Sequence, residues 1–311
     1  MKNIVIFDDY DVRDLKPPAL IAEYLRLTER DVAEMLVPAA TNEIVCPACH
    51  SAEVASAFVK YGLTYRECGN CRSLYVSPRP DDVALARYDA ESEARRYWRE
   101  TLAPGSGHAR REKIVKPRSE WVADSTREHR PAAHTYADIG TAQESYLEEI
   151  VAENLFETVV RDAGAVSADV VSLFEVADRT SDVDALFTRV SAMLPAGGLV
   201  FVTAILGSGF DLLTLWDRAD NVFPPDRLNV LSVDGLGILF ARHGFEALEF
   251  STPGILDVEI VATALRRDPS LPLDRWARYI AGRDERTRRT FQNFLQSELL
   301  SSYGRFVLRK S

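Results

Sequence analysis

The sequence predicts an α/β protein in which a mostly parallel sheet, flanked by helices, follows a small cysteine-rich unit. Residues 168–176 are a candidate for a buried strand and residues 199–205 form a second, apolar one, both with the length of parallel strands, and amphipathic helical stretches alternate with them. All four cysteines fall in two C-x-x-C pairs near the N-terminus. The 311 residues are 46% hydrophobic and 27% charged, which is ordinary for a globular chain and excludes a disordered or fibrous class.

The N-terminal segment is expected to form a short strand at 3–7 and then a helical arm. Pro17 and Pro18 suit the first turn of a helix. Thr28-Glu-Arg-Asp31 has capping-box spacing, which leaves open whether the arm is one helix or two. The apolar run at 4–7 is shorter than a signal peptide requires, and no window reaches the ~18 apolar residues of a membrane span. We therefore expect a cytoplasmic protein with no membrane partner.

The two cysteine pairs predict a zinc ribbon. Cys46-Pro-Ala-Cys49 and Cys68-Gly-Asn-Cys71 are separated by the 18 residues 50–67. Two such turns can bring four thiolates to one centre, the tetrahedral sulfur arrangement that a structural Zn²⁺ prefers. The competing interpretation is a pair of disulfides or a redox dithiol, although persistent disulfides are rare in a reducing compartment. Because four thiolates close the coordination shell, we expect a structural metal, with His50 as a solvent-facing neighbour.

From residue 81 to about 125 the chain is charged and helix-prone, which predicts a helical linker. Its basic residues gather in one stretch, which consists of Arg110, Arg111, Lys113, Lys116 and Arg118. Such a run is either a solvated face or an anion-binding site, and the sequence leaves both open. The formal net charge of −10 repels phosphate backbones, so we expect no nucleic-acid partner.

The remaining elements alternate as an α/β sheet requires. After a first strand that ends near 136–140, we expect a helix at 182–193, a turn at 195–198, and strands at 168–176, 199–205, 247–251 and 305–309, with a helix-rich stretch at 274–300. Ser232 can cap a further helix whose Leu236, Leu239 and Phe240 share one face.

Several motifs together resemble class I S-adenosylmethionine-dependent methyltransferases that carry an N-terminal zinc ribbon. They are the two cysteine pairs, Tyr75-Val-Ser-Pro-Arg-Pro80, Asp138-Ile-Gly140, Leu194-Pro-Ala-Gly-Gly198 and His243-Gly-Phe245. The resemblance covers nearly the whole chain. It implies a Rossmann-like methyltransferase domain at 131–311, preceded by an N-terminal arm at 1–41, the ribbon at 42–80 and the helical linker at 81–130. It also implies S-adenosylmethionine as cofactor and a substrate among sugars, polysaccharides or small natural products.

The cofactor site that the resemblance implies, on Asp138, Gly140 and Asp162, is altered in this chain. The family's loop has the form Asp-x-Gly-x-Gly-x-Gly, whereas Ala142 and Glu144 stand here at the second and third glycine positions. A carboxylate side chain at a point where the backbone approaches the cofactor is expected to weaken binding severely.

The sheet is also expected to be reduced. Residues 163–168 separate Asp162 from the next strand, and a crossover between parallel strands needs about a dozen residues or more. The second helix and third strand that the resemblance implies are therefore expected to be missing.

Two histidine positions of the family are occupied here by Asp178-Arg179 and by Arg227. Arginine stays protonated near neutral pH and cannot act as a general base. The two arginines could clamp a phosphate or carboxylate, or they could be ordinary surface residues. No catalytic residue can be assigned.

Two functions remain open. The first is a methyltransferase-like protein with impaired or lost S-adenosylmethionine binding that works on a small molecule. The second is a catalytically inactive scaffold, or pseudoenzyme, that binds a partner protein and stabilises an active homologue or pathway enzyme. Either is compatible with a homo- or hetero-oligomer.

Overall fold

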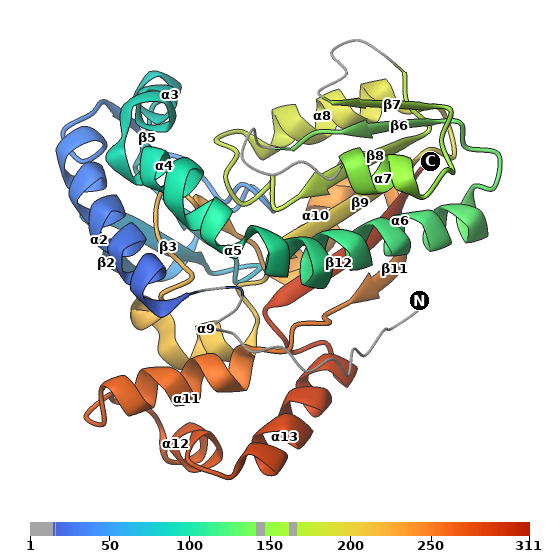
Figure 1. The fold of residues 1–311 in the computed structure, drawn as a ribbon. Helices are drawn as coiled ribbons and strands as arrows, with labels where there is room; N and C mark the ends of the chain where they lie inside the picture. Colours follow the sequence, from blue (N-terminus) through green and yellow to red (C-terminus); the bar gives the residue numbers. More distant parts are fainter. Residues whose placement is uncertain (1–14, 16, 141–146, 162–166) are drawn as a thin grey trace.

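The computed structural model describes residues 15, 17–140, 147–161 and 167–311, and a six-stranded sheet forms its centre (Figure 1). The strand order is β11-β12-β9-β8-β6-β7. The strands are β6 (Thr135–Asp138), β7 (Thr158–Arg161), β8 (Val170–Phe174), β9 (Leu199–Ile205), β11 (Phe245–Ser251) and β12 (Tyr303–Lys310). The first four run parallel to one another, and β12 is antiparallel to both of its neighbours. The predicted α/β class with a mostly parallel sheet is confirmed.

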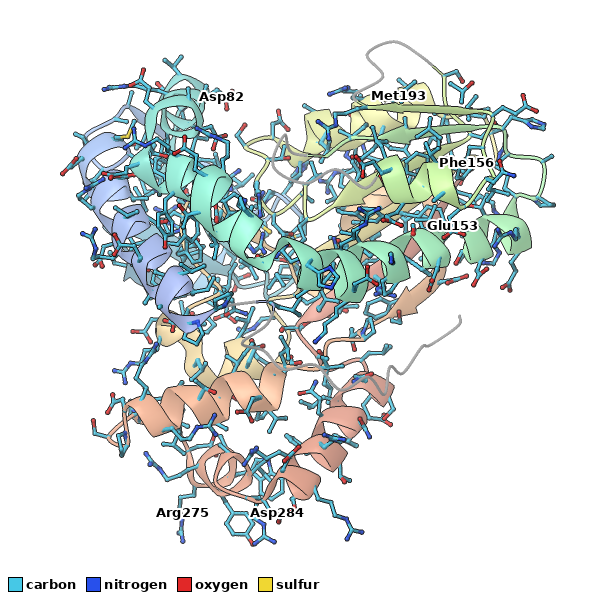
Figure 2. The ribbon with its side chains drawn as sticks, viewed as in Figure 1. Asp82, Glu153, Phe156, Met193, Arg275 and Asp284 are labelled. Carbon is cyan, nitrogen blue, oxygen red and sulfur yellow. The ribbon has the colours of Figure 1, made fainter. Side chains whose placement is uncertain are left out.

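Helices cover both faces of this sheet. Alternate residues of β9 point to opposite faces, so Val200 packs toward α8 (Val183–Met193) and α10 (Val233–Arg242), whereas Phe201 packs toward Trp121. Trp121 belongs to α6 (Lys116–His129), which lies with α7 (Leu147–Ala152) on the second face (Figure 1). Phe156, labelled in Figure 2, packs on the same face against Tyr136, with ring centroids 5.2 Å apart. Burial on two sides explains why β8 and β9 are apolar apart from Ser172 and Thr203.

β7 lies at one edge of the sheet, as expected for a reduced sheet. Only residues 162–169 lie between β7 and β8, and within the described ranges no further strand pairs with β7. The predicted strand at 3–7 lies outside the described residues.

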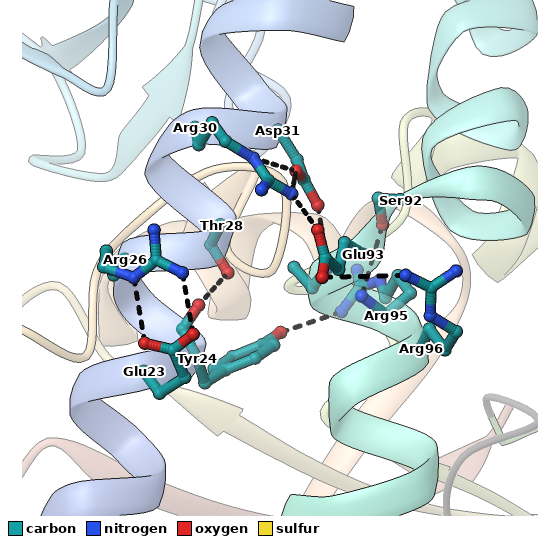
Figure 3. Close-up of polar contacts among 11 residues, drawn as sticks. Glu23, Tyr24, Arg26, Thr28, Arg30, Asp31, Ser92, Glu93, Arg95 and Arg96 are labelled. Carbon is teal, nitrogen blue, oxygen red and sulfur yellow. Dashed lines mark hydrogen bonds and ion pairs between the residues drawn. The ribbon is translucent and has the colours of Figure 1, made fainter.

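The predicted linker is helical. It consists of α3 (Asp82–Glu91), α4 (Glu93–Tyr97), η1 (Trp98–Leu102), α5 (Ala103–Arg110), η2 (Arg111–Val115) and α6, where η1 and η2 are π-helical turns. Within residues 17–41 of the preceding arm the structure describes one helix, α2 (Pro18–Met35). Thr28 lies inside it and donates its hydroxyl to the carbonyl of Tyr24, at 2.8 Å, instead of capping a second helix. Figure 3 shows how α2 and α4 are joined: the Arg30 guanidinium binds both Asp31 and Glu93, each at 2.6 Å.

A second sheet contains the cysteine-rich segment. Its order is β10-β4-β3-β2, with all neighbours antiparallel. The strands are β2 (Val54–Lys60), β3 (Leu63–Cys68), β4 (Leu74–Val76) and β10 (Asn229–Val230), and a separate pair joins β1 (Thr41–Asn42) to β5 (Arg79–Pro80). Strand β10 therefore joins this sheet from a position far along the chain, where Asn229 and Val230 pair with Tyr75 and Leu74.

The remaining helices lie beyond the two sheets (Figure 1). They are α9 (Phe210–Leu215), η3 (Trp216–Arg218), α11 (Asp257–Arg267), α12 (Arg275–Ala281) and α13 (Glu285–Ser297). Figure 2 labels Arg275 and Asp284 at the starts of α12 and α13, where Asp284 caps α13 by accepting the Thr287 backbone N–H. None of the helices in the described ranges has both the length and the apolar content of a bilayer span.

Candidate metal centre and ligand cavity

The four cysteines that were predicted to bind zinc lie together. Their Sγ atoms all lie within 4.8 Å of one another, with 3.6 Å between Cys46 and Cys71 and 3.5 Å between Cys49 and Cys68. Tetrahedral zinc with Zn–S bonds of about 2.3 Å separates its sulfurs by about 3.8 Å. The cluster therefore has nearly the dimensions of a loaded Cys₄ site.

The equal spacing of the two pairs produces two equivalent turns. The residue after each second cysteine, His50 or Arg72, has a left-handed backbone with φ of 60° or 62°. Its N–H donates to the carbonyl of the first cysteine, Cys46 at 2.9 Å and Cys68 at 3.0 Å. The His50 side chain is exposed and its Nε2 lies 2.7 Å from Asp184, so it turns away from the sulfurs, as expected.

The cysteine cluster is joined to the start of α10. Ser73 accepts hydrogen bonds from the Cys71 thiol at 3.2 Å and from the Ser232 backbone N–H at 3.0 Å. Ser232 caps α10, as predicted, by accepting the Gly235 N–H at 2.9 Å, and its hydroxyl donates to the Cys71 carbonyl. Because Cys46, Cys68 and Cys71 also belong to the hydrophobic core of the large sheet, a metal here would brace both sheets.

A second group of candidate metal ligands lies away from the cysteines. Ligand atoms of Glu128, His129 and Glu249 lie within 4.8 Å of one another. Glu249 is buried and already accepts from Ser125, and it lies 2.8 Å from His129 Nε2. This arrangement is accounted for as a hydrogen-bonded contact between α6 and β11.

A cavity of about 290 Å³ lies at the carboxyl ends of β8 and β9. Glu175 directly follows β8, Ile205 ends β9, and Tyr303 and Arg305 contribute from β12, whose antiparallel direction brings its first residues to the same edge. Ligands of open α/β sheets bind outside this edge. The volume is near the lower limit of small-molecule pockets.

Glu175 is the centre of a buried ion network on the cavity floor. Its two oxygens accept from Arg118 Nη2 at 3.0 Å and Arg227 Nη2 at 2.7 Å. Burial opposes ionisation, but the two guanidinium groups hold the pKa of Glu175 well below its ordinary value. Arg227 also lies 3.5 Å from Asp178, whose pKa burial raises to about 6.

These contacts decide the role of Arg227 that the sequence left open. Its side chain is 12% exposed and paired with Glu175, so the interpretation as an ordinary surface arginine is wrong. Both oxygens of Glu175 are engaged, and the described lining residues include neither histidine nor cysteine. The floor can orient charge, but it offers no imidazole or thiol as a general base.

Asp138 and Gly140, two of the predicted cofactor residues, are not among the described residues that line this cavity. Asp138 ends β6 and is fully buried, and it accepts the Ser172 hydroxyl at 2.7 Å. Gly140 follows two residues later and is half-buried. Asp162, Ala142 and Glu144 lie outside the described residues. Asp138 and Gly140 do lie where the strand order reverses between β6 and β8, which is the position that the resemblance implies for a nucleotide cofactor.

Sequence reasoning missed Glu175 as a functional candidate. The signal was available, because Glu175 stands near the end of the predicted strand 168–176, and polar residues at carboxyl ends of parallel strands face the ligand edge. Its two arginine partners come from separate helical and loop segments, which a linear pattern does not connect.

Comparisons with known proteins place this chain in no family: no family model and no curated protein matches it. Among solved structures, it is similar to a cyclopropane synthase from Mycobacterium tuberculosis, with 16% identity over 64% of this chain and 85% of that one and a TM-score of 0.40.

Two further structures are an O-methyltransferase of a trans-AT PKS multienzyme from Brevibacillus brevis, in complex with S-adenosyl-L-homocysteine, and an amino pentose methyltransferase from Micromonospora echinaspora with bound S-adenosylmethionine. The first has 17% identity over 71% of this chain and 80% of that one, with a TM-score of 0.37. The second has 22% identity over 32% and 55%, with a TM-score of 0.27. At such scores the likeness concerns the general arrangement of the fold and says nothing about activity, substrate or cofactor.

Proposed function

We propose that this chain is a class I methyltransferase-like protein with impaired or lost S-adenosylmethionine binding, which holds a small molecule for sugar or small-molecule tailoring. The observation that carries the proposal is the short connection between β7 and β8. Residues 162–169 are too few for a helical crossover, so the wall beyond β7 that would enclose a nucleoside is reduced.

The buried state of Asp138 supports the same proposal. Its carboxylate accepts from Ser172, whose hydroxyl in turn accepts from Tyr136 at 2.6 Å, so the group is engaged within the sheet. Both oxygens of the Glu175 carboxylate are bound by arginines, so Glu175 itself is not a ready acceptor for a substrate proton.

The proposal includes a structural Zn²⁺ at Cys46, Cys49, Cys68 and Cys71. The separations of the sulfurs support it. It also retains the division into 1–41, 42–80, 81–130 and 131–311 and a cytoplasmic location.

Calorimetric titration of the full-length, zinc-loaded chain with S-adenosylmethionine and S-adenosyl-L-homocysteine tests the proposal. We expect no saturable heat at millimolar ligand. Micromolar binding of either compound would overturn it. The variant Glu144→Gly restores a family glycine, so any affinity that it gains measures how much of the loss comes from the loop and how much from the reduced sheet.

The alternative function is a scaffold that binds a partner protein. It is favoured by aromatic side chains left exposed on α12 and α13: Trp276 and Tyr279 are each 59% exposed and Phe294 is 49% exposed. Trp276 and Phe294 both pack against Phe291, which makes the group contiguous. Sedimentation of the full chain beside Trp276→Ser tests self-association through this surface, since a dimer that the variant dissociates would support it.

A further inference from the structure

We propose that the cavity at the carboxyl ends of β8 and β9 binds a neutral, mainly apolar small molecule, and not a sugar or an organic ion. This inference deepens the proposed function and rests on it in taking the cavity as the ligand site. It narrows the class of ligand to the apolar branch of small-molecule tailoring.

Apolar side chains from distant parts of the chain line the cavity. Helix α2 contributes Ile21 and Leu25, and the π-helical turns η1 and η2 contribute Leu102 and Ile114. A second set comes from the segment that leads into α11 and includes Ile255. An apolar ligand that packs against these side chains is removed from water together with them, which favours its binding.

Three aromatic rings extend the same apolar surface. Tyr24, Trp98 and Phe223 all line the cavity. The centroid of the Tyr24 ring lies 5.2 Å from that of Trp98 and 6.1 Å from that of Phe223, so the three rings form one continuous group. The Tyr24 hydroxyl is already engaged, because it donates to Asp226 at 2.6 Å and accepts from Arg95 at 3.2 Å (Figure 3). The rings therefore offer a ligand their apolar faces and edges.

The carboxylates of the described lining are held by protein groups. They are Glu175, Asp220, Asp226 and Asp257. Glu175 is bound by the two arginines of the cavity floor. Asp220 pairs with Arg267 at 2.7 Å, and Asp226 pairs with the buried Arg95. Asp257 accepts the Ser302 backbone N–H at 2.6 Å. A cationic ligand would have to compete with these contacts.

The cationic side chains of the described lining also interact with other groups of the chain. They are Arg110, Lys113, Arg118, Arg179, Arg227 and Arg305. Arg118, for example, donates to Glu175 at 3.0 Å and to the Tyr303 hydroxyl at 2.9 Å. An anionic ligand would likewise have to replace contacts that the chain already makes. The charged side chains therefore give no advantage to an ion of either sign.

The neutral polar groups of the described lining favour a ligand with few hydroxyl groups. The Ser106 hydroxyl donates to the Leu102 carbonyl at 3.0 Å. Trp98 Nε1 and Asn221 Oδ1 make no hydrogen bond, but protein atoms cover both of them. A sugar that entered the cavity would exchange its hydrogen bonds with water for few with the protein, and this loss opposes binding.

Four probes built on one carbon ring test the class of ligand: cyclohexanol, myo-inositol, cyclohexanecarboxylate and cyclohexylammonium. Cyclohexanol and myo-inositol share the ring and differ only in the number of hydroxyl groups. Each probe competes with the neutral fluorophore N-phenyl-1-naphthylamine for the full-length, zinc-loaded chain. We expect saturable binding of the fluorophore, and we expect cyclohexanol to displace it at a concentration about tenfold or more below that of the other three.

Two results overturn the inference. One is the lack of a saturable rise in fluorescence up to the solubility limit of the fluorophore. The other is displacement by myo-inositol, or by either ion, that is as effective as displacement by cyclohexanol.

Variants with the same substitution locate the site. Ile114→Asn places an amide in the cavity wall and is expected to weaken binding of the fluorophore by about tenfold. Ile255→Asn, in the second set of apolar side chains, repeats the test. Ile238 of α10 is 41% exposed and is not among the described lining residues, so Ile238→Asn is expected to retain wild-type affinity. Zinc content and circular dichroism verify that each variant is folded.

The variants also show whether the fluorophore binds elsewhere. Wild-type affinity in both Ile114→Asn and Ile255→Asn would mean that it binds at another surface, such as the exposed aromatic side chains of α12 and α13. That result, or an equal loss in Ile238→Asn, would overturn the assignment to the cavity.

This competition assay and the cofactor titration fail separately. Binding of S-adenosylmethionine would overturn the proposed function without changing the order of the ring probes. Displacement of the fluorophore by myo-inositol, in a chain that does not bind the cofactor, would overturn the apolar class of ligand alone.

Discussion

Gly235 and Gly237 of α10 offer a matched test of how the cysteine cluster is joined to the large sheet. A Cβ added at Gly235 would lie 2.3 Å from Ser73 Oγ, 3.0 Å from Ala48 Cβ and 3.1 Å from Ser232 Oγ. A Cβ added at Gly237 meets no atom within 4 Å. The methyl group of alanine is therefore buried against the cysteine-containing turns at position 235, whereas at position 237 it points to open space.

The expected energies differ in sign. Alanine in place of glycine within a helix favours folding by about 0.5–1 kcal/mol, so Gly237→Ala is expected to be stabilising by that amount. At Gly235 the same gain is opposed by an overpacking cost of about 1–3 kcal/mol. Ser73 can move away from the new methyl group only if it loses its hydrogen bond with Cys71 Sγ or the one from the Ser232 N–H. This loss adds a cost of about 1 kcal/mol. The net expectation for Gly235→Ala is destabilisation by about 1–3 kcal/mol.

The affinity for zinc provides a second measurement of the same contact between Ser73 and the cysteine cluster. Loss of a hydrogen bond to a ligand sulfur lowers affinity by about 10–100-fold in comparable sites, so Gly235→Ala is expected to bind zinc more weakly. Urea unfolding at saturating zinc and competition with a chromophoric chelator measure the two effects. If Gly235→Ala matches Gly237→Ala in both stability and zinc affinity, the contact through Ser73 does not join the metal centre to α10.

Two further predictions concern the metal and a buried carboxyl. Purified protein is expected to contain about one zinc per chain, which Cys71→Ser loses and His50→Ala keeps; metal analysis below about half an equivalent contradicts the ribbon. Burial, with Asp257 nearby, raises the pKa of Asp211 to about 7, so the folded protein keeps a proton that the unfolded chain releases near pH 4. Stability is therefore expected to fall as pH rises from about 4 to 7, by up to about 1.4 kcal/mol per pH unit, and Asp211→Asn is expected to flatten this slope; equal slopes in urea unfolding would refute the assignment.

Elements that depend on the local pattern of apolar and polar residues could be predicted well from the sequence. β9 occupies the predicted residues 199–205, because a strand covered on both faces needs an unbroken apolar run. The helix cap at Ser232 could be predicted because a hydroxyl side chain directly precedes a helix with one apolar face. The clustering of the four cysteines could be predicted because two C-x-x-C pairs at this spacing can bring four sulfurs to one centre.

Other features depend on partners that the linear sequence does not reveal. β10 is two residues long and is a strand only because Leu74 and Tyr75 pair with it. In the sequence Arg227 is indistinguishable from a surface arginine, because its partner Glu175 lies 52 positions earlier in the chain and only the fold brings the two together. Which residues of the basic stretch line the cavity could not be predicted without knowing which helical face meets it.

The late arrival of β10 has a consequence for biosynthesis. On the ribosome, all four clustered cysteines emerge well before Asn229 and Val230, so the cysteine-rich sheet cannot add its last strand until most of the chain has been made. An excised fragment that stops after β4 would keep every sulfur yet expose the edge of β4 that β10 covers in the whole chain. We expect such a fragment to aggregate, so the cysteine-rich segment is poorly suited to use as an independent domain in another protein.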